Sequence, residues 1–402
     1  MRAWLVLGIL SALAACGGVA PAGLPASSSP SPRPSPTATP AGPLETLKLA
    51  CVGPQSGELA FLGKPSLQAC QMAVDEFNAR AGGIQGVKVE VVPGDDAGSA
   101  EQATRLAAKL SADRAVLGMV GPMTSAAVLA AGPTFDAAHI AFVSQSASNP
   151  KITESGWKTG HRLVARDDAE GSADAEFVFG PPLNAKKAFV VDRHEPYSIS
   201  LADEFEKRAK ALGIKTERGS LTGSPDYAAL ISRAKAANPD VLFFPDQGSQ
   251  CAAMLLEMQK QAVSSRLMSS DGCHDKERFI AASQGAAEGM FVSDTGAGYD
   301  TTPEGQAWAK DFRAKFGAEP GPFSWYAYDA ARIVLQAVDS AAKAKGSLEL
   351  RPADVNAEIA KIKDFNGLLG PITFNAKGDV ENASIAIFQV VGGEFKQVKK
   401  VR

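Results

Sequence analysis

Residues 116–150, VLGMVGPMTSAAVLAAGPTFDAAHIAFVSQSASNP, contain the clearest indication of the fold class of this chain. The stretch opens with a continuous apolar run over 116–120, which is typical of a parallel strand buried on both faces. The pattern that follows predicts a helix over 125–138, and a second apolar run predicts a strand over 140–143. A strand, a helix and a strand in this order indicate a parallel sheet with helices on its faces.

The same alternation continues on both sides of that stretch. Before it, strands are predicted over 47–52 and 87–92, and helices over 65–81 and 99–110. Further along, the predicted strands are 188–191, 241–244, 267–268 and 289–292. The predicted helices there are 198–212, 227–237, 249–261, 303–316 and 323–344. The chain is expected to end in a hairpin-like pair, 372–374 and 383–391, around a turn at 375–379.

Together these elements predict an α/β protein with two doubly wound halves that face each other across a cleft. In open parallel sheets, ligands bind at the carboxyl ends of the strands, close to the N-termini of the helices that follow. The loops after the strands are therefore where functional residues are expected.

Composition narrows the class of partner. From Leu44 onward there is enough chain for two domains of ordinary size. The sequence is 45% hydrophobic and 21% charged, near globular averages. Its net charge of −3 favours neither nucleic acid nor an acidic membrane surface as a partner. With 4 histidines among 402 residues, a metal site built from several histidines is not expected, and no cofactor is predicted.

The N-terminus has the features of an export signal. Met1 and Arg2 precede an apolar run over 3–13, which is too short to span a bilayer. The run ends in the sequence LAAC, so the segment resembles a bacterial lipoprotein signal in which Cys16 becomes the lipid-bearing first residue. An ordinary signal peptide with a chance cysteine is the alternative. We expect residues 1–15 to be removed and Cys16 to anchor the mature protein in a membrane.

The expected segment 16–43 consists of the lipid-bearing Cys16 and a linker from Gly17 to Pro43. It alternates proline with Ser, Thr and Ala and offers few apolar side chains to bury; its prolines include Pro30, Pro32, Pro34, Pro36 and Pro40. Such a segment favours extended, polyproline-like conformers and acts as a semi-stiff spacer of roughly 3 Å per residue. We expect it to hold the globular part away from a membrane surface.

Cysteine usage fits an exported protein. Without Cys16, an even number remains: Cys51, Cys70, Cys251 and Cys273. Disulfides persist outside the cytoplasm, and three connectivities are possible. We favour the local pairing, Cys51 with Cys70 and Cys251 with Cys273, over four buried free thiols, which would behave as small core hydrophobes.

Signatures of catalysis are weak. The sequence contains no GxGxxG, Walker P-loop, HExxH or GxSxG motif. Ser148 to Lys151 matches SxxK and 158–160 matches KTG, but penicillin-recognising enzymes have the KTG strand much later in the chain. The neighbours Cys273, His274 and Asp275 are interpreted as a polar loop, because three adjacent residues rarely converge on one metal ion. We therefore predict a protein that is not an enzyme.

Hydroxyl groups follow both strands of the opening stretch. Ser125 stands where a helix begins, so free N–H groups and the positive end of the helix dipole lie close by and suit a carboxylate. Ser146 and Ser148 belong to a second loop, 144–150, which is expected at the same sheet edge. Helix capping is the alternative role for any one serine, but two such loops after neighbouring strands predict a ligand site.

The second half offers complementary groups. Asp271 comes just beyond the strand at 267–268, where its carboxylate could pair with a ligand ammonium group; a turn aspartate before Gly272 is the alternative. Tyr197 follows the strand at 188–191 and could supply a ring face and a hydroxyl group, or be an exposed loop residue.

An ordered set of motifs carries a family resemblance from residue 44 to the C-terminus. The motifs are KLACVGPQSG (48–57), AVDEFN (73–78) before GGIQG (82–86), DD (95–96), GP (121–122) with Ser125, SSDG (269–272), and GPITF (370–374) with GD (378–379). The region resembles the Leu/Ile/Val-binding proteins of ABC transporters, the periplasmic binding proteins of type 1. The resemblance implies two Rossmann-like lobes, joined by crossovers near 164–166, 292–293 and 373–374, that close on ligand like a hinge.

The resemblance also implies roles for individual residues. A carboxylate on the ligand would meet Ser125, groups at Ser146 and Ser148 would hold its carboxylate and ammonium, Asp271 would pair with the ammonium, and Tyr197 would close from the second lobe. Phe61, Leu62, Phe323 and Gln247 fall where the family lines its specificity pocket. An aromatic residue is common in leucine binders at the position of Gln247. A buried glutamine without a partner costs free energy, so a polar ligand side chain or an ordered water is predicted there.

The resemblance predicts an extracytoplasmic, lipid-anchored binding protein that delivers an α-amino acid, branched-chain or related, to an ABC permease. We expect it to act as a monomer. The alternative is a sensor that reports the ligand to a membrane receptor. The expected boundaries place 44–164 and 293–373 in lobe 1, and 165–292 and 374–402 in lobe 2.

Overall fold

A computed structural model describes residues 42–223, 225–295 and 298–401. The expected signal peptide, Cys16 and the linker up to residue 41 lie outside these residues and stay predictions. No helix in the described ranges is long and apolar enough to cross a membrane.

Lobe 1 is built around a parallel sheet with the strand order β2-β1-β3-β4-β5. Its strands are β1 (Leu47–Gly53), β2 (Val89–Asp95), β3 (Val116–Val120), β4 (Ala141–Ser144) and β5 (Gly160–Arg162). Every residue of β3 and β4 is buried, as the continuous apolar runs predicted. The chain leaves β1 toward β2 on one side and β3 lies on the other, so the order reverses at β1.

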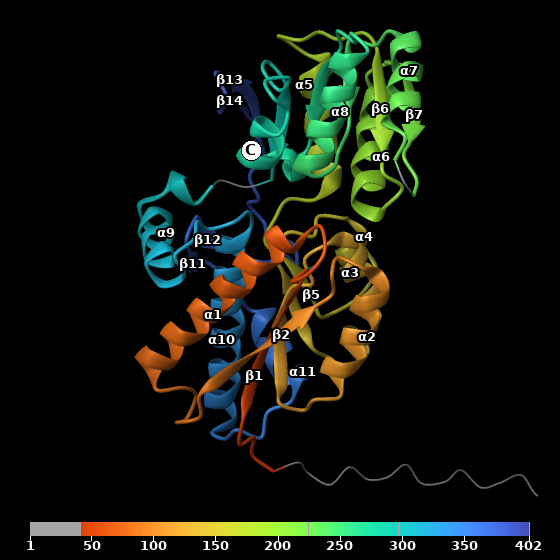
Figure 1. Cartoon of the computed structure of the whole chain (residues 1–402). Helices are drawn as coiled ribbons and strands as arrows, with labels where there is room; N and C mark the ends of the chain where they lie inside the picture. Colours follow the sequence, from red (N-terminus) through yellow and green to blue (C-terminus); the bar gives the residue numbers. More distant parts are fainter. Residues whose placement is uncertain (1–41, 224, 296–297, 402) are drawn as a thin grey trace, which may run out of the picture. The chain divides into compact units, whose positions relative to one another are not determined.

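Helices cover both faces of this sheet. From the first part of the chain come α1 (Ala60–Ala81), α2 (Ala100–Ser111), α3 (Ser125–Ala137) and α4 (Lys151–Glu154). Later segments add η3 (Tyr299–Thr301), α9 (Pro303–Phe316), α10 (Ser324–Lys345), α11 (Pro352–Ile359) and the antiparallel pair β11 (Phe365–Gly367) and β12 (Gly370–Ile372). Figure 1 shows α1 and α10 on one side of the strands and α2 and α3 on the other.

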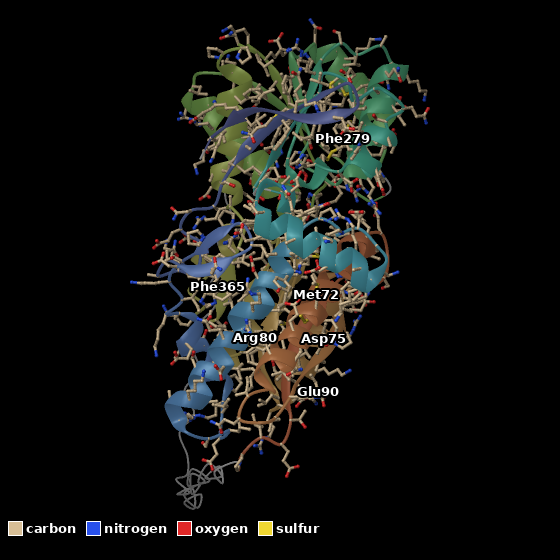
Figure 2. All side chains as sticks on the ribbon, turned by 90° about the vertical axis from the view of Figure 1, so that its left-hand side faces the viewer. Met72, Asp75, Arg80, Glu90, Phe279 and Phe365 are labelled. Carbon is tan, nitrogen blue, oxygen red and sulfur yellow. A yellow bond between two sulfur atoms is a disulfide. The ribbon has the colours of Figure 1, made fainter. Side chains whose placement is uncertain are left out.

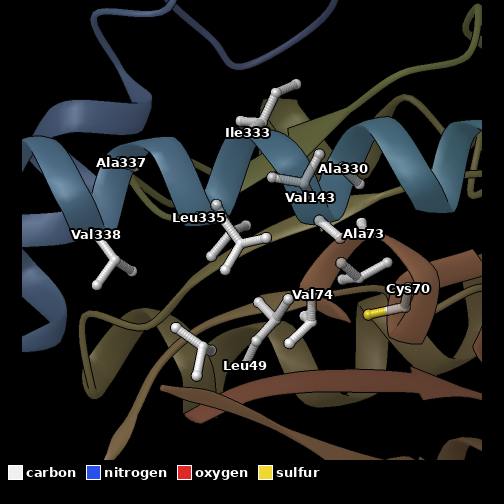
Figure 3. Close-up of a cluster of buried hydrophobic side chains, with 14 of the residues drawn as sticks. Leu49, Cys70, Ala73, Val74, Val143, Ala330, Ile333, Leu335, Ala337 and Val338 are labelled. Atoms are coloured by element: carbon white, nitrogen blue, oxygen red, sulfur yellow. The ribbon is translucent and has the colours of Figure 1, made fainter. Parts of the chain in front are cut away.

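The core of lobe 1 joins segments that are distant in sequence. Helix α10 brings Leu335 and Val338 onto Leu49 of β1 and Val74 of α1, and all four are buried (Figure 3). Each such side chain contributes roughly 1.5–3 kcal/mol when it leaves water. This burial anchors the late helices to the lobe that the early strands begin.

Lobe 2 is built around a sheet with the order β14-β13-β10-β9-β8-β6-β7. Its parallel strands are β6 (Ala188–Asp192), β7 (Thr216–Ser220), β8 (Val241–Phe243), β9 (Arg266–Ser269) and β10 (Phe291–Asp294). Strand β13 (Ala386–Val391) is antiparallel to β10, and β14 (Glu394–Lys400) is antiparallel to β13. Its helices are α5 (Asp167–Phe179), α6 (Pro196–Ala211), α7 (Tyr227–Ala237), α8 (Gly248–Lys260), η1 (Asp271–Cys273) and η2 (Lys276–Ala281). Figure 2 labels Phe279 of this lobe, and Met72 and Phe365 of lobe 1.

Two of the three connections between the lobes lie later in the chain than the sequence predicted. Strand β10 belongs to the lobe 2 sheet as far as Asp294, so the boundary expected at 293 is too early. After β12, Asp379 still forms a backbone bridge with Arg162 of β5, and its carboxylate also accepts a 2.7 Å hydrogen bond from Nε of the fully buried Arg162 side chain. The crossing expected near 373–374 therefore follows Asp379. Nη1 of Arg166 lies 3.2 Å from the same carboxylate, which ties the first connection to the third.

The expected C-terminal hairpin is wrong in its partners. Strand β12 pairs with β11, and the turn at 375–379 is spanned by a short bridge between Phe374 and Val380 and by backbone hydrogen bonds such as that from the Glu381 N–H to the Thr373 carbonyl. The hairpin of this region joins β13 to β14 through Gly392 and Gly393, whose φ values of 63° and 75° suit glycine. The residues of β14 are mostly exposed and rich in lysine, which is typical of an edge strand and hid it from an apolar pattern.

The cysteines adopt the local pairing. A disulfide joins Cys51 to Cys70 with the Cα atoms 6.6 Å apart, and another joins Cys251 to Cys273 at 6.3 Å. The first fastens β1 to α1. The second fastens α8 to η1, so it links the loops that follow β8 and β9.

Candidate ligand-binding site

A cavity of about 200 Å³ lies between the loops of the two lobes. Drug-sized ligands occupy about 300–1,000 Å³, so this space suits a smaller molecule. Lobe 1 lines it with Glu58, Leu59, Leu62, Gly98, Met123, Thr124, Ser125, Ala126, Ser146 and Phe323. Lobe 2 lines it with Arg193, Glu195, Tyr197, Asp246, Gln247, Gln250, Asp271 and Gly272.

The position of the cavity follows from the topology of the sheets. Its lobe 1 residues come mainly from the loops after β1 and β3, the neighbours at which the strand order reverses. Its lobe 2 residues follow β6, β8 and β9, which are also neighbours. Carboxyl ends of parallel strands meet at one edge, and the crevice beside the reversal is where such sheets bind ligands.

The start of α3 forms an anion-binding wall. Thr124, rather than Ser125, is the N-cap, because its hydroxyl oxygen accepts a 3.2 Å hydrogen bond from the Ala127 N–H. Ser125 is the first helical residue; its hydroxyl oxygen accepts from the Asn149 N–H at 3.3 Å and keeps a proton to donate. The N–H groups of Ser125 and Ala126 have no acceptor within the helix. This wall can therefore hold a carboxylate.

Of the two serines that the sequence predicted at the site from the loop after β4, Ser146 lines the cavity and Ser148 does not. The Ser146 hydroxyl donates to the Met123 carbonyl at 2.7 Å and lines the cavity, so its lone pairs can accept from a ligand. Ser148 is fully buried away from the cavity, where its carbonyl accepts from the Asp167 N–H at 3.0 Å. The structure thus brings Ser125 and Ser146 to the site, but not Ser148.

Asp271 presents a carboxylate from the opposite wall. The Tyr197 hydroxyl donates to Oδ1 at 2.5 Å, and the Thr295 hydroxyl donates to Oδ2 at 3.0 Å. Burial raises the pKa of Asp271 to about 6, an increase that the hydrogen bond from Tyr197 opposes. Above that pH the group is mostly ionised, and its oxygens have lone pairs left to accept from an ammonium group.

Two further carboxyl groups lie behind Asp271. The Asp271 N–H donates to Glu170 at 3.0 Å, and the Ser293 hydroxyl lies 2.7 Å from Glu170 and 3.2 Å from Asp174. Burial raises the pKa of both Glu170 and Asp174 well above the ordinary range, so these side chains favour their neutral forms. A neutral pair there limits the repulsion that Asp271 would otherwise meet.

The expected specificity residues separate into two groups. Leu62, Gln247 and Phe323 line the cavity, and Phe323 has a φ of 62°, a backbone conformation that non-glycine residues adopt mainly where the surroundings enforce it. Phe61 does not line the cavity. Its ring instead lies under the guanidinium group of Arg278 from lobe 2, with 3.7 Å between the guanidinium carbon and the ring centre.

The sequence profile of the periplasmic binding protein family matches residues 46–394. The chain belongs to this family. Its members are solute-binding proteins, so the prediction that this chain is not an enzyme agrees with its family. The α/β lobes with parallel sheets are those of a periplasmic binding protein.

Curated relatives match over most of their length. An amino acid binding protein of Pseudomonas aeruginosa is 27% identical over 351 residues, covering 86% of this chain and 90% of the relative. A Leu/Ile/Val-binding protein homolog of Brucella melitensis is 30% identical over 329 residues, covering 81% of this chain and 85% of the relative. The predicted resemblance to Leu/Ile/Val-binding proteins is thus confirmed.

Solved structures show the same fold. The leucine-binding protein LivK of Thermotoga maritima superposes with a TM-score of 0.79 at 24% identity, covering 89% of this chain and 99% of that one. The branched-chain amino acid binding protein LivJ of Streptococcus pneumoniae, solved with isoleucine, has a TM-score of 0.77 at 25% identity, covering 89% and 99%.

The structure also adds polar residues that the sequence analysis of this periplasmic binding protein missed. Glu58, Arg193, Asp246 and Gln250 line the cavity, and Glu195 caps α6 beside it by accepting from the N–H groups of Tyr197 and Ser198. Asp246 follows the strand predicted at 241–244, so the rule that singled out Asp271 would also have found it. The interpretation of Cys273, His274 and Asp275 as a polar loop fits their contacts, since Cys273 is in a disulfide and His274 pairs with Asp294.

Proposed function

We propose that this periplasmic binding protein captures an α-amino acid for an ABC importer. The observation that carries the proposal is the placement of Ser125 and Asp271 on opposite walls of one cavity. One wall offers a hydroxyl proton and the N-terminus of α3, and the other offers a buried carboxylate. This arrangement complements a zwitterion that has a carboxylate and an ammonium group on the same carbon atom.

The α3 wall and the Asp271 wall contact the same ligand only when the two lobes close. An α-carboxylate at α3 and an α-ammonium at Asp271 would each lose water on closure, and each would regain partners in fixed positions. A ligand that lacks either charge would leave a desolvated group unpaired, which costs about 1–3 kcal/mol or more. The names of the relatives, which include amino acid binding and Leu/Ile/Val-binding proteins, support the same ligand class.

The remaining parts of the proposal concern delivery. Residues 1–15 would direct export, Cys16 would carry lipid, and the proline-rich linker would let a monomeric binding domain reach the permease. Stable anchoring needs more than one acyl chain, since each buried CH₂ contributes only about 0.8 kcal/mol. Labelling of the full-length protein with a radioactive fatty acid, compared with a Cys16→Ser variant, tests this part separately.

A thermal-shift screen against the twenty amino acids, their amides and small organic acids tests the ligand class. A ligand at about 100 times its dissociation constant adds about 2.7 kcal/mol to the free energy of unfolding. We expect at least one α-amino acid to raise the melting temperature, and its counterpart without the α-amino group to have little effect. A screen in which only compounds lacking an ammonium group stabilise the protein would contradict the proposal.

A further inference from the structure

The part of the cavity beside Asp271 contains hydrogen-bond acceptors that the protein does not satisfy. Within the described residues, Oδ2 of Asp246 and Oε1 of Gln250 are buried and accept no hydrogen bond. Asp246 is 6% exposed and Gln250 is 8% exposed, and both line the cavity. Buried acceptors without a donor are costly, so their presence indicates that something else donates to them when the site is filled.

Neighbouring protein groups do not supply the missing hydrogen-bond donors to Asp246 and Gln250. Nε of Arg193 lies 3.4 Å from Asp246 Oδ2, without the alignment of a hydrogen bond. The Gln250 amide nitrogen is already directed to Glu58 across the cavity, which leaves its oxygen as the free end. Burial raises the pKa of Asp246 to about 7 despite Arg193, as expected for a carboxylate with too little compensation.

The charges of the residues that line the cavity also favour a ligand side chain that is not acidic. Among the described lining residues, the acidic side chains are Glu58, Glu195, Asp246 and Asp271, and the formal positive charge is that of Arg193. Asp271 is assigned to the α-ammonium, and Glu195 is occupied in capping α6. Glu58 and Asp246 therefore outnumber Arg193, which disfavours a ligand with an acidic side chain.

The spacing between the strands that precede Asp271 and Asp246 suits a ligand side chain that extends from the ligand's α-carbon. Asp271 follows β9 and Asp246 follows β8, and adjacent strands lie about 4.8 Å apart. The disulfide between Cys251 of α8 and Cys273 of η1 links the segments that carry these carboxylates. A ligand held at Asp271 would therefore point its side chain along a neighbouring strand end toward Asp246 and Gln250.

We propose that the amino acid bound here has a side chain that ends in nitrogen hydrogen-bond donors, an ammonium, guanidinium or carboxamide group, which Asp246 and Gln250 receive. This inference rests on the proposed amino-acid function and narrows its ligand class. An apolar branched side chain would leave both acceptors unsatisfied. A carboxylate would face them and Glu58 with like charge or with further acceptors.

Two matched pairs of amino acids test the inference by calorimetry on the purified protein with its disulfides intact. L-lysine and L-norleucine differ by the terminal ammonium group, and L-glutamine and L-glutamate differ by an amide against a carboxylate. We expect a preference of at least about tenfold for the donor-ended member of one pair, as for a hydrogen bond to a charged or buried acceptor. L-leucine is measured alongside them.

A variant at Asp246, compared with a control variant on the surface, tests whether the preference depends on this carboxylate. Asp246→Asn should lower the affinity for the preferred donor-ended ligand by about tenfold and leave that of L-norleucine within about threefold, whereas Asp300→Asn, exposed on η3, should change neither. If norleucine, glutamate or leucine binds as tightly as the donor-ended ligands, the inference is overturned while the amino-acid function stands. If no amino acid binds at all, both fail.

Discussion

The phenolic hydroxyl of Tyr197 lies 2.5 Å from Asp271 Oδ1 and also 2.8 Å from the Ser270 hydroxyl. Tyr197 belongs to the first turn of α6, which Glu195 caps, so its ring position is fixed by the helix start. The tyrosine therefore orients the carboxylate that the proposed ligand ammonium would meet. This contact joins the loops after β6 and β9 into one wall of the cavity.

Removing that hydroxyl should weaken ligand binding in a pH-dependent way. In Tyr197→Phe, Asp271 loses a donor, so its pKa should rise above its present value of about 6. Because the ammonium group needs the ionised carboxylate, we expect a loss of about 1.5–3 kcal/mol in binding free energy, larger at pH 6 than at pH 8. Calorimetry at both pH values measures it.

Tyr299→Phe is the control, since Tyr299 packs on Trp308 and Trp325 in lobe 1 and does not line the cavity. Equal losses for Tyr197→Phe at pH 6 and pH 8 would show that the hydroxyl does not act through the ionisation of Asp271.

A contact between the lobes should govern how long the ligand stays. Arg278 of lobe 2 stacks on Phe61 of lobe 1, and such cation–π contacts contribute about 0.5–2 kcal/mol. Arg278→Ala should favour lobe separation and raise the dissociation rate about 2- to 10-fold, with little change in the association rate. Stopped-flow fluorescence with the ligand found by screening measures both rates.

The double variant Phe61→Leu with Arg278→Ala separates this contact from other effects. If the two residues act through each other, the second substitution adds almost nothing to the first. Fully additive effects on the dissociation rate would mean that the stacking does not hold the lobes together.

The buried carboxyl behind the site should make stability depend on pH. The folded pKa of Asp174 is well above the value near 3.9 expected in an unfolded chain. Its protonated form therefore contributes stability that is complete below about pH 4 and is lost as the pH rises through the folded pKa. Asn resembles the protonated form and can still accept from Ser293. Asp174→Asn should thus gain about 1–2 kcal/mol relative to the native chain between pH 5 and pH 8.

Urea denaturation at the two pH values measures this gain. Asp311→Asn, exposed on α9, serves as the control and should give the same difference at both pH values. A pH-independent difference for Asp174→Asn would indicate that Asp174 is already ionised in the folded protein.

The sequence was sufficient to predict which residues would meet where regular elements fix them. Ser125 and Asp271 follow strands whose carboxyl ends form the sheet edges, so the alternation of strands and helices was enough to place them on facing loops. Ser148 shows the limit of this reasoning. In a loop, the direction of each side chain depends on contacts made elsewhere, and the contact of Ser148 with Asp167 of α5 is not visible in the local pattern.

The expectation that Phe61 lines the cavity differs from the structure for a different reason. The apolar pattern predicted a helix from residue 65, but α1 begins at Ala60 and contains Pro65 in its interior. Phe61 and Leu62 are therefore both helical, and successive helical residues point in directions about 100° apart. Leu62 faces the cavity while Phe61 faces Arg278.

The crossing between the lobes after Asp379 was also not predictable from the local sequence. It depends on a pairing of Asp379 with Arg162, which is 217 residues away in sequence.

The pairing of Asp271 with a ligand ammonium group is tested by calorimetry on the native chain and on Asp271→Asn, using the amino acid that binds best and its counterpart without the α-amino group. We expect Asp271→Asn to lose roughly 100-fold or more in affinity for the amino acid and to change less than about threefold in affinity for the counterpart. An unchanged dissociation constant for the amino acid, or equal losses for both ligands, would contradict a cavity that pairs Asp271 with the ammonium group of a zwitterion.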